Sequence, residues 1–164
     1  MTPETLAAFL SQPIIAVLAT LRRDGRPYLV PVWFLWRDDA FWLTGTTART
    51  WCRHILRDPR VSLCIESTEP VTRYVAVDCL ATPVYDEIWP LTTALARKYL
   101  GARPGATEAD VEQFVATMRR EPRLLFRLTP TAPPAHWRAI DLTVYTGARG
   151  DRAWQRRQAG AGER

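Results

Sequence analysis

Short apolar runs separated by polar turns dominate the first half of the chain. Two of them, IIAVLATL at 14–21 and PYLVPVWFLW at 27–36, flank Asp24-Gly25, a dipeptide that is typical of hairpin turns. A third run, AFWLTG at 40–45, follows the polar turn Arg37-Asp38-Asp39. The pattern therefore predicts three strands of an antiparallel meander. Later runs predict strands at 60–67, 73–84, 123–130 and 136–145, with a turn at Glu69-Pro70 between the first two of these.

The hexapeptide PVWFLW, residues 31–36, has no polar residue on either face of an extended strand. Val32, Phe34 and Trp36 would point one way, and Pro31, Trp33 and Leu35 the other. A sheet with one solvated face normally alternates apolar and polar residues. We therefore expect a strand that is covered on both sides, by a barrel interior on one side and by a helix, a partner subunit or a flat ligand on the other.

Helical segments are marked by capping residues and by apolar positions at helical spacing. Thr2 followed by Pro3 predicts a helix to about residue 10. Thr46 or Thr47 can cap a helix that runs to about residue 57, and two further helices are expected from Asp86 to Gly101 and from Thr107, where Asp110 completes a capping-box pattern. Five to seven short strands with one inserted helix indicate a small barrel of the α+β class rather than a doubly wound sheet.

Length and composition are those of one globular domain. The chain has 164 residues, and we assign 1–146 to the domain and 147–164, which is polar and rich in Gly and Arg, to a disordered C-terminal tail. No apolar run approaches the ~20 residues of a membrane span, and no signal peptide is visible, so we expect a soluble, cytoplasmic protein with no membrane partner.

The cysteine, histidine, lysine and arginine content limits the kinds of binding site that the chain can form. Three cysteines without CxxC spacing predict buried or free thiols in a reducing compartment, and two histidines are too few for a zinc site, so no metal is expected. Lys98, the sole lysine, is expected on a solvated helix face. The net charge of +5 leaves nucleic-acid binding as an alternative, but the arginines are scattered and several lie in the tail, so no nucleic-acid partner is predicted.

The segment 44–61 is the best candidate for a binding site. Arg49 and Arg53 lie one helical turn apart, and with the hydroxyls of Thr46 and Thr47 they could form a phosphate cradle at a helix start. A solvated helix face is the alternative. Cys52 shares an apolar arc with its neighbours and is interpreted as a buried structural thiol. Because no acid, base or nucleophile is apparent, the catalytic residues stay unknown and any reactivity would come from a cofactor.

Taken in order, IIAVLAT, DGRPYLVPVWFLW, AFWLTG, RHILRDPRVSLCIE and RYVAVDCLA resemble the pyridoxamine 5′-phosphate oxidase-like split-barrel family of FMN- and deazaflavin-binding proteins. The resemblance implies a six-stranded antiparallel split β-barrel with flanking helices, which forms a homodimer and holds cofactors at the subunit interface. It also implies a set of cofactor-binding positions: Val32, Trp33 and Phe34 along the ring, Thr44, Thr46, Thr47 and Arg49 near the phosphate, Arg53 on the following helix, and Trp137 on the last strand.

Two departures from the family pattern are visible. The phosphate-binding lysine is absent, because RTWCRHI places Trp51 at or near its position and His54 at the usual asparagine, so Arg49 or Arg53 would have to replace it. Cys79 stands where glycine is common. The substrate-phosphate motifs of the true vitamin-B6 oxidases are also missing.

The function expected from the resemblance is an FMN-dependent oxidoreductase acting on an unidentified small-molecule substrate, not a true pyridoxamine phosphate oxidase. One alternative is a deazaflavin-dependent reductase. The other is a non-catalytic flavin or haem binding protein, for which His54 and His136 are the available histidine ligands.

Overall fold

The computed structural model describes residues 1–68 and 72–141. The elements in chain order are α1 (Pro3–Ser11), β1 (Ala16–Leu21), β2 (Pro27–Val32), β3 (Leu35–Arg37), β4 (Ala40–Thr46), α2 (Thr50–Arg57), β5 (Arg60–Ser67), β6 (Arg73–Val84), α3 (Ile88–Leu100), α4 (Glu108–Met118), β7 (Arg123–Pro130), a short 3-10 turn η1 (Pro134–His136) and β8 (Arg138–Asp141).

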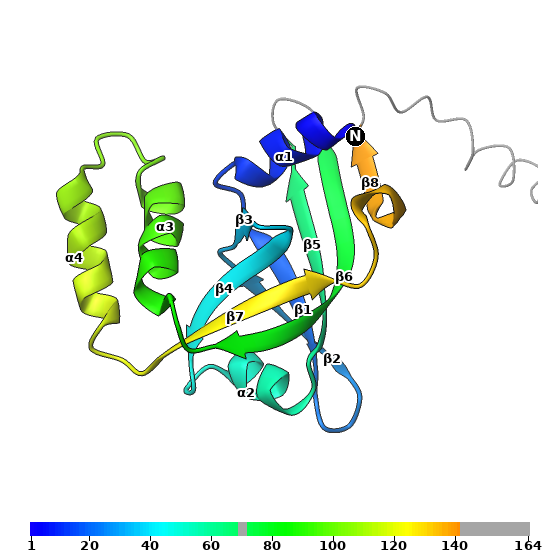
Figure 1. Ribbon diagram of the computed structural model, residues 1–164, viewed down its shortest axis with the longest axis horizontal. Coiled ribbons are helices and arrows are strands. Elements are labelled where there is room, and N and C mark those ends of the chain that lie inside the picture. The colour runs from blue at the N-terminus through cyan, green and yellow to red at the C-terminus, as the bar shows by residue number, and fades with distance from the viewer. Residues whose placement is uncertain (69–71, 142–164) are drawn as a thin grey trace, which may run out of the picture.

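The strands form one antiparallel sheet that curls into a split barrel. Its order is β2-β1-β5-β6-β7-β4-β3, and β8 pairs with β6 (Figure 1). The α+β class and the split barrel are thus confirmed, but the described residues contain eight strands rather than the expected six. The run 27–36, expected as one strand, divides into β2 and β3, whereas β8 corresponds to the strand expected at 136–145.

The prediction of one continuous strand at 31–36 is wrong. Trp33 and Phe34 belong to neither β2 nor β3, and these two strands occupy opposite edges of the sheet. We call the dipeptide Trp33-Phe34 the seam. The chain changes edge here, so it cannot stay in one ladder. Even so, Val32 and Phe34 both face the core, while Pro31 is exposed and the ring of Trp33 is covered by helices.

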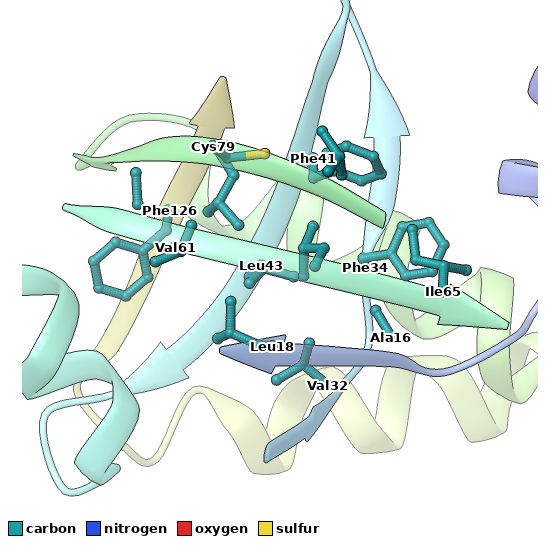
Figure 2. Close-up of a cluster of buried hydrophobic side chains, with 14 of the residues drawn as sticks. Ala16, Leu18, Val32, Phe34, Phe41, Leu43, Val61, Ile65, Cys79 and Phe126 are labelled. Carbon is teal, nitrogen blue, oxygen red and sulfur yellow. The ribbon is translucent and has the colours of Figure 1, made fainter. Parts of the chain in front are cut away.

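The core lies inside the curled sheet and is built from alternate residues of the strands. Leu18, Leu43, Val61 and Ile65 converge with three aromatic rings, those of Phe34, Phe41 and Phe126 (Figure 2). Cys79 is 2% exposed and packs in the same cluster. Outward residues of β1 and β5, in contrast, are exposed or half-buried.

The helices surround the barrel. In Figure 1, α1 and α2 lie at opposite ends of it, α3 lies against its flank, and α4 packs beside α3. The predicted caps are confirmed at Thr2, whose hydroxyl accepts from the Thr5 N–H, and in the capping box of Thr107 and Asp110. The helix predicted to about residue 57 is observed as α2, but its predicted cap at Thr46 or Thr47 is wrong, because Arg49 is the N-cap residue and no side chain caps the helix. The third helix begins at Ile88 instead of Asp86, after Glu87 adopts a left-handed conformation with φ of 57°.

Lys98 does not lie on a solvated helix face, as expected, but is half-buried between α1 and the seam. The predicted last strand is observed as β8, and positions 142–145, the Glu69-Pro70 turn and the predicted tail lie outside the described residues. In the described part of the chain, no helix is long and apolar enough to cross a bilayer. Within the same residues, no group of three or more metal-ligating side chains is assembled.

Candidate functional site

A pocket of about 330 Å³ lies beside the seam, between the barrel and the α3–α4 pair. Its barrel side is formed by the ends of β2 and β4, and its helical side by α3 and α4. The apolar part of the lining consists of Val30, Pro31, Val32, Trp33, Trp51, Leu95, Ala96, Phe114 and Met118. The polar part consists of Thr44, Thr92, Arg49 and Arg123. The pocket thus has a long apolar, aromatic wall and a small cationic region, which suits a flat ligand with an anionic group.

The cationic region is formed by residues that are distant in sequence. Arg49 is the exposed residue before α2, a helix whose first turn has no side-chain cap. Arg123 begins β7, where it is paired in register with Thr46 of β4. Unpaired N–H groups at a helix start and two guanidinium groups all favour a negative ligand. This arrangement could hold a phosphate group.

Arg123 carries a positive charge that its surroundings compensate poorly. Its side chain is 8% exposed, and its Nε is buried without a hydrogen-bond partner. The nearest carboxylate, on the 60%-exposed side chain of Glu121, is 3.5 Å from Nη2, which also contacts the Met118 sulfur at 2.6 Å. Burial lowers the pKa of Arg123, Glu121 opposes this change, and the nearby charge of Arg49 lowers the pKa further. An anion bound between the two arginines would offset this electrostatic cost.

The structure brings four of the nine predicted cofactor-binding residues together in this pocket: Val32, Trp33, Thr44 and Arg49. The other five lie elsewhere. Phe34 is fully buried in the core, Thr46 is 5% exposed, and Thr47 is exposed on the loop before α2. The local sequence of 46–53 does not distinguish residues that line the pocket from residues that do not, because it does not show which side chains turn toward β7.

Arg53 is used by its own loop. Its Nη1 donates to the carbonyls of Thr47 and Ala48 at 3.1 and 3.0 Å, and its Nη2 donates to Thr50 Oγ1 at 3.3 Å. These contacts satisfy carbonyl groups in the turn that leads into α2. Arg53 therefore supports the position of Arg49 and does not line the pocket.

Trp137 lies on the other side of the barrel. Its ring packs against Trp36 and Phe41, with centroid distances of 5.4 and 5.8 Å, and its Nε1 donates to the carbonyl of Ala132. It lines a larger groove of about 680 Å³ on the outer face of β1, β5 and β6. The groove and the pocket are neighbours, because Pro31 of the pocket pairs in register with Val17 of the groove.

The outer groove has an apolar floor. A row of small and apolar residues crosses four neighbouring strands in register: Pro31, Val17, Cys64 and Ala76. Val17 is 41% exposed, and Leu29, one row further along β2, is 64% exposed. Exposed apolar surface of this extent on a sheet is typical of contact with another protein surface.

Two remaining candidate groups have structural roles. Burial raises the pKa of the Cys52 thiol to about 12, more than Arg49, Arg123 and Arg53 lower it, so this thiol stays protonated. His54 is buried, its Nδ1 lies 3.0 Å from Thr20 Oγ1, and its ring meets the edge of Tyr28. Burial, followed by the charges of three nearby arginines, lowers the pKa of His54. The prediction of a structural Cys52 is confirmed, and His54 is not placed to bind haem.

The sequence reasoning missed Arg123. It stands 74 positions after Arg49, and only the pairing of β4 with β7 brings the two together. The available signal was an arginine at the first position of a predicted strand that otherwise alternates toward the core.

A protein-family comparison matches residues 2–132 to the pyridoxamine 5′-phosphate oxidase model. The chain belongs to this family. The resemblance read from the ordered motifs is therefore confirmed, and with it the split-barrel fold. A comparison with curated protein sequences gives no match.

Solved structures with the same fold cover several functional descriptions. A conserved hypothetical protein from Mycobacterium tuberculosis is 23% identical, with a TM-score of 0.70 and coverage of 86% of this chain and 85% of its own. An F420 reductase is 28% identical, with a TM-score of 0.59 and coverage of 76% and 92%. A haem storage protein from Vibrio cholerae is 18% identical, with a TM-score of 0.62 and coverage of 80% and 91%. Solved structures with this fold thus include one described as a reductase and one described as a haem storage protein.

Proposed function

We propose that this protein is a flavin-dependent oxidoreductase that binds its cofactor in the pocket beside the seam. The observation that carries the proposal is the buried, poorly compensated guanidinium of Arg123, which lines an aromatic pocket together with Arg49. Flavin cofactors combine these two requirements, because they join a flat ring system to a phosphate group. Family membership supports the same conclusion.

Different residues of the pocket would bind different parts of the cofactor. The wall from Val30 to Trp33 would lie along the ring, while Arg49 and Arg123 would neutralise the phosphate in place of the missing lysine. The bound flavin would supply the two-electron redox chemistry. Trp33, Phe114 and Met118 would exclude water from that part of the pocket, and the side chains here would contribute position and electrostatics.

FMN is the proposed cofactor, and a deazaflavin cofactor is the alternative favoured by the likeness to an F420 reductase. Both carry phosphate, so the arginine pair does not separate them. A non-catalytic flavin carrier would use the same pocket. The substrate is an unidentified small molecule, and pyridoxamine phosphate is not proposed because the motifs that bind its phosphate are absent from the sequence.

We further propose that the protein is a cytoplasmic homodimer whose apolar groove faces a second copy. The row of Pro31, Val17, Cys64 and Ala76 supports this arrangement, and so does the position of the pocket at the edge of the same face. Leu29→Arg places a charge on the exposed part of this face, so it should convert a dimer into a monomer in sedimentation velocity. A wild-type protein that sediments as a monomer at all concentrations would refute the dimer.

The binding proposal is tested with FMN, riboflavin and the deazaflavin cofactor in isothermal titration calorimetry. Arg123→Met should weaken FMN binding by about tenfold to a hundredfold, equal to ~1.4 to 2.8 kcal/mol, and leave riboflavin binding unchanged because riboflavin lacks the phosphate. Arg127→Met is the matched control, because Arg127 lies two alternate positions along the same strand, is exposed, and is absent from the pocket lining.

Three outcomes bear on the proposal. Failure of the wild-type protein to bind any of these compounds would refute it. Equal loss of FMN binding in the Arg123 and Arg127 variants would remove the phosphate role of Arg123 and leave general charge attraction. Tight binding of FMN or deazaflavin without reduction or oxidation by a panel of nicotinamide and quinone substrates would favour the carrier.

A further inference from the structure

The seam is held by the side chains of α3 and not by a strand partner. The Phe34 N–H donates to Tyr99 Oη at 3.0 Å, and the Phe34 carbonyl accepts from Lys98 Nζ at 3.0 Å. Both polar main-chain groups of this residue are therefore satisfied from one helix. Backbone groups that are buried without a partner are costly, so these two bonds fix the place where the chain changes edge of the sheet.

Tyr99 has a single proton to donate, and two carbonyls lie within reach. Its Oη is 2.8 Å from the Ile14 oxygen and 3.2 Å from the Phe34 oxygen. The shorter distance favours Ile14, which leaves Lys98 as the main donor to the Phe34 carbonyl. Tyr99 thus joins the segment before β1 to the seam, and the two α3 residues have separate tasks.

Lys98 joins three parts of the molecule. Besides the Phe34 carbonyl, its Nζ donates to the carbonyl of Leu10 in the last turn of α1 at 2.9 Å, and it lies 3.7 Å from the centroid of the Phe34 ring. The C-terminal end of a helix and the face of an aromatic ring both favour a cation. Among the described residues, no carboxylate is within ion-pair distance of this ammonium. Carbonyl dipoles and the ring therefore take the place of a counter-ion.

The same helix also sets the wall of the pocket. The ring of Trp33 stacks on the ring of Tyr99 with a centroid distance of 4.7 Å and an interplanar angle of 3°, and it contacts Phe114 of α4 at 5.6 Å. Trp33 lines the pocket, whereas Phe34, the next residue, is in the core. A shift or rotation of the seam would therefore move Trp33 directly.

We propose that Lys98 and Tyr99 are positioning residues, which hold the seam so that Trp33 forms a rigid wall of the cofactor pocket. The proposal rests on the proposed function, since it assigns these two residues to the same site. Neither contacts the pocket: they act through Trp33 and the backbone of Phe34. A preformed aromatic wall lowers the cost of ordering side chains on binding.

The test uses two variants that remove single polar groups. Tyr99→Phe keeps the ring that stacks on Trp33 and removes the hydroxyl, and Lys98→Met keeps most of the stem and removes the ammonium. Arg97→Met is the control, because it removes a cation from the adjacent position of α3, where Arg97 is exposed and pairs with Glu108. Each protein is labelled with 5-fluorotryptophan, and the Trp33 resonance is identified with Trp33→Phe.

Both test variants should shift the ¹⁹F resonance of Trp33 and leave those of Trp42 and Trp137 in place. Both should also weaken FMN binding by about tenfold, equal to ~1.4 kcal/mol, while Arg97→Met does neither. Lys98→Arg, which retains a cation and donors, should restore part of the affinity. If one variant fails to fold, the other still gives both readouts.

An unmoved Trp33 resonance in the folded variants would overturn the proposal, and so would a loss of affinity that Arg97→Met reproduces. Failure of the proposed function has a different signature, in which the wild-type protein binds neither FMN nor the deazaflavin cofactor. The ¹⁹F shift alone then decides whether Lys98 and Tyr99 hold the wall.

Discussion

Gly45→Ala should be the most informative single-methyl substitution in the molecule. Gly45 lies in β4 under the start of α2 and lines the pocket. A Cβ at this position would lie 2.4 Å from Cys52 Sγ, and 2.7 and 2.8 Å from Cζ2 and Cη2 of Trp51. Carbon atoms in van der Waals contact are about 3.5–4.0 Å apart, so each neighbour would have to move by about 1 Å. Neither neighbour is free to do so, because Trp51 is 6% and Cys52 0% exposed.

The magnitude follows from two opposing effects. Overpacking of a well-packed site costs ~1–3 kcal/mol, and the upper end applies here because two buried side chains of one helix are displaced together. Replacing glycine by alanine reduces the entropy of the unfolded chain, which returns ~0.4–1 kcal/mol. The free energy of unfolding should therefore fall by ~2 kcal/mol, measured by urea denaturation with far-ultraviolet circular dichroism.

A double-mutant cycle tests the cause. Cys52→Ala removes the sulfur that makes the shortest contact, so its combination with Gly45→Ala should be less destabilising than the sum of the single variants by ~1 kcal/mol. Gly25→Ala is the control. It has a φ of +79° in the hairpin turn with nothing within 4 Å of the new methyl, so it should cost ~1 kcal/mol through backbone strain alone and show no coupling to Cys52. A Gly45→Ala protein within ~0.5 kcal/mol of the wild type, or strict additivity with Cys52→Ala, would refute the packing argument.

Three further predictions concern buried polar groups. Burial lowers the pKa of Lys98 to about 8, below its ordinary 10.5, so between these pH values Lys98 is protonated in the unfolded chain and largely deprotonated in the folded protein. The free energy of unfolding should therefore rise from pH 8 to 10 by up to ~1 kcal/mol per pH unit in urea titrations. Lys98→Met should remove this pH dependence. Burial raises the pKa of Cys52 and of Cys79 to about 12, so neither thiol should react with Ellman's reagent at pH 8 until the protein unfolds. Rapid reaction of either thiol in the native state would contradict the described packing. Asp141→Asn removes the carboxylate that lies 2.9 Å from Arg73, whose side chain is only 22% exposed. The free energy of unfolding should therefore fall by ~2 kcal/mol, and an unchanged urea midpoint would contradict this prediction.

Local signals allowed much of the fold to be predicted. The Asp24-Gly25 turn, with Gly25 in the left-handed region, and the capping box at Thr107 each depend on residues a few positions apart. The chemistry of a short peptide is enough to specify such features. The order of several such motifs was also sufficient to recognise the family, because the order reflects the sequence of strands along the chain and does not depend on where the strands lie in space.

Parts of the candidate site depend on contacts between distant segments and were missed for that reason. Arg123 reaches Arg49 through strand pairing, and Lys98 reaches Phe34 across 64 positions. Composition suggested that a lone lysine late in a helix faces solvent, but two carbonyls and an aromatic ring hold it inside. Arg53 shows the opposite error, because carbonyls of its own loop compete successfully for its guanidinium. For Lys98 and Arg53 the hydrogen-bond acceptors include main-chain carbonyls, whose positions a side-chain pattern does not display.

The split in the barrel has a mechanical consequence. The strands β2 and β3 lie at opposite edges of the sheet and are joined only by the seam. Within residues 1–68 and 72–141, no backbone hydrogen bonds between strands therefore close the barrel at this boundary. Widening the molecule there would break the side-chain bonds from α3 and the core contacts of Phe34, but it would leave the strand pairing intact. We therefore expect local opening along this boundary to cost less free energy than separating two paired strands, and the boundary lies beside the pocket.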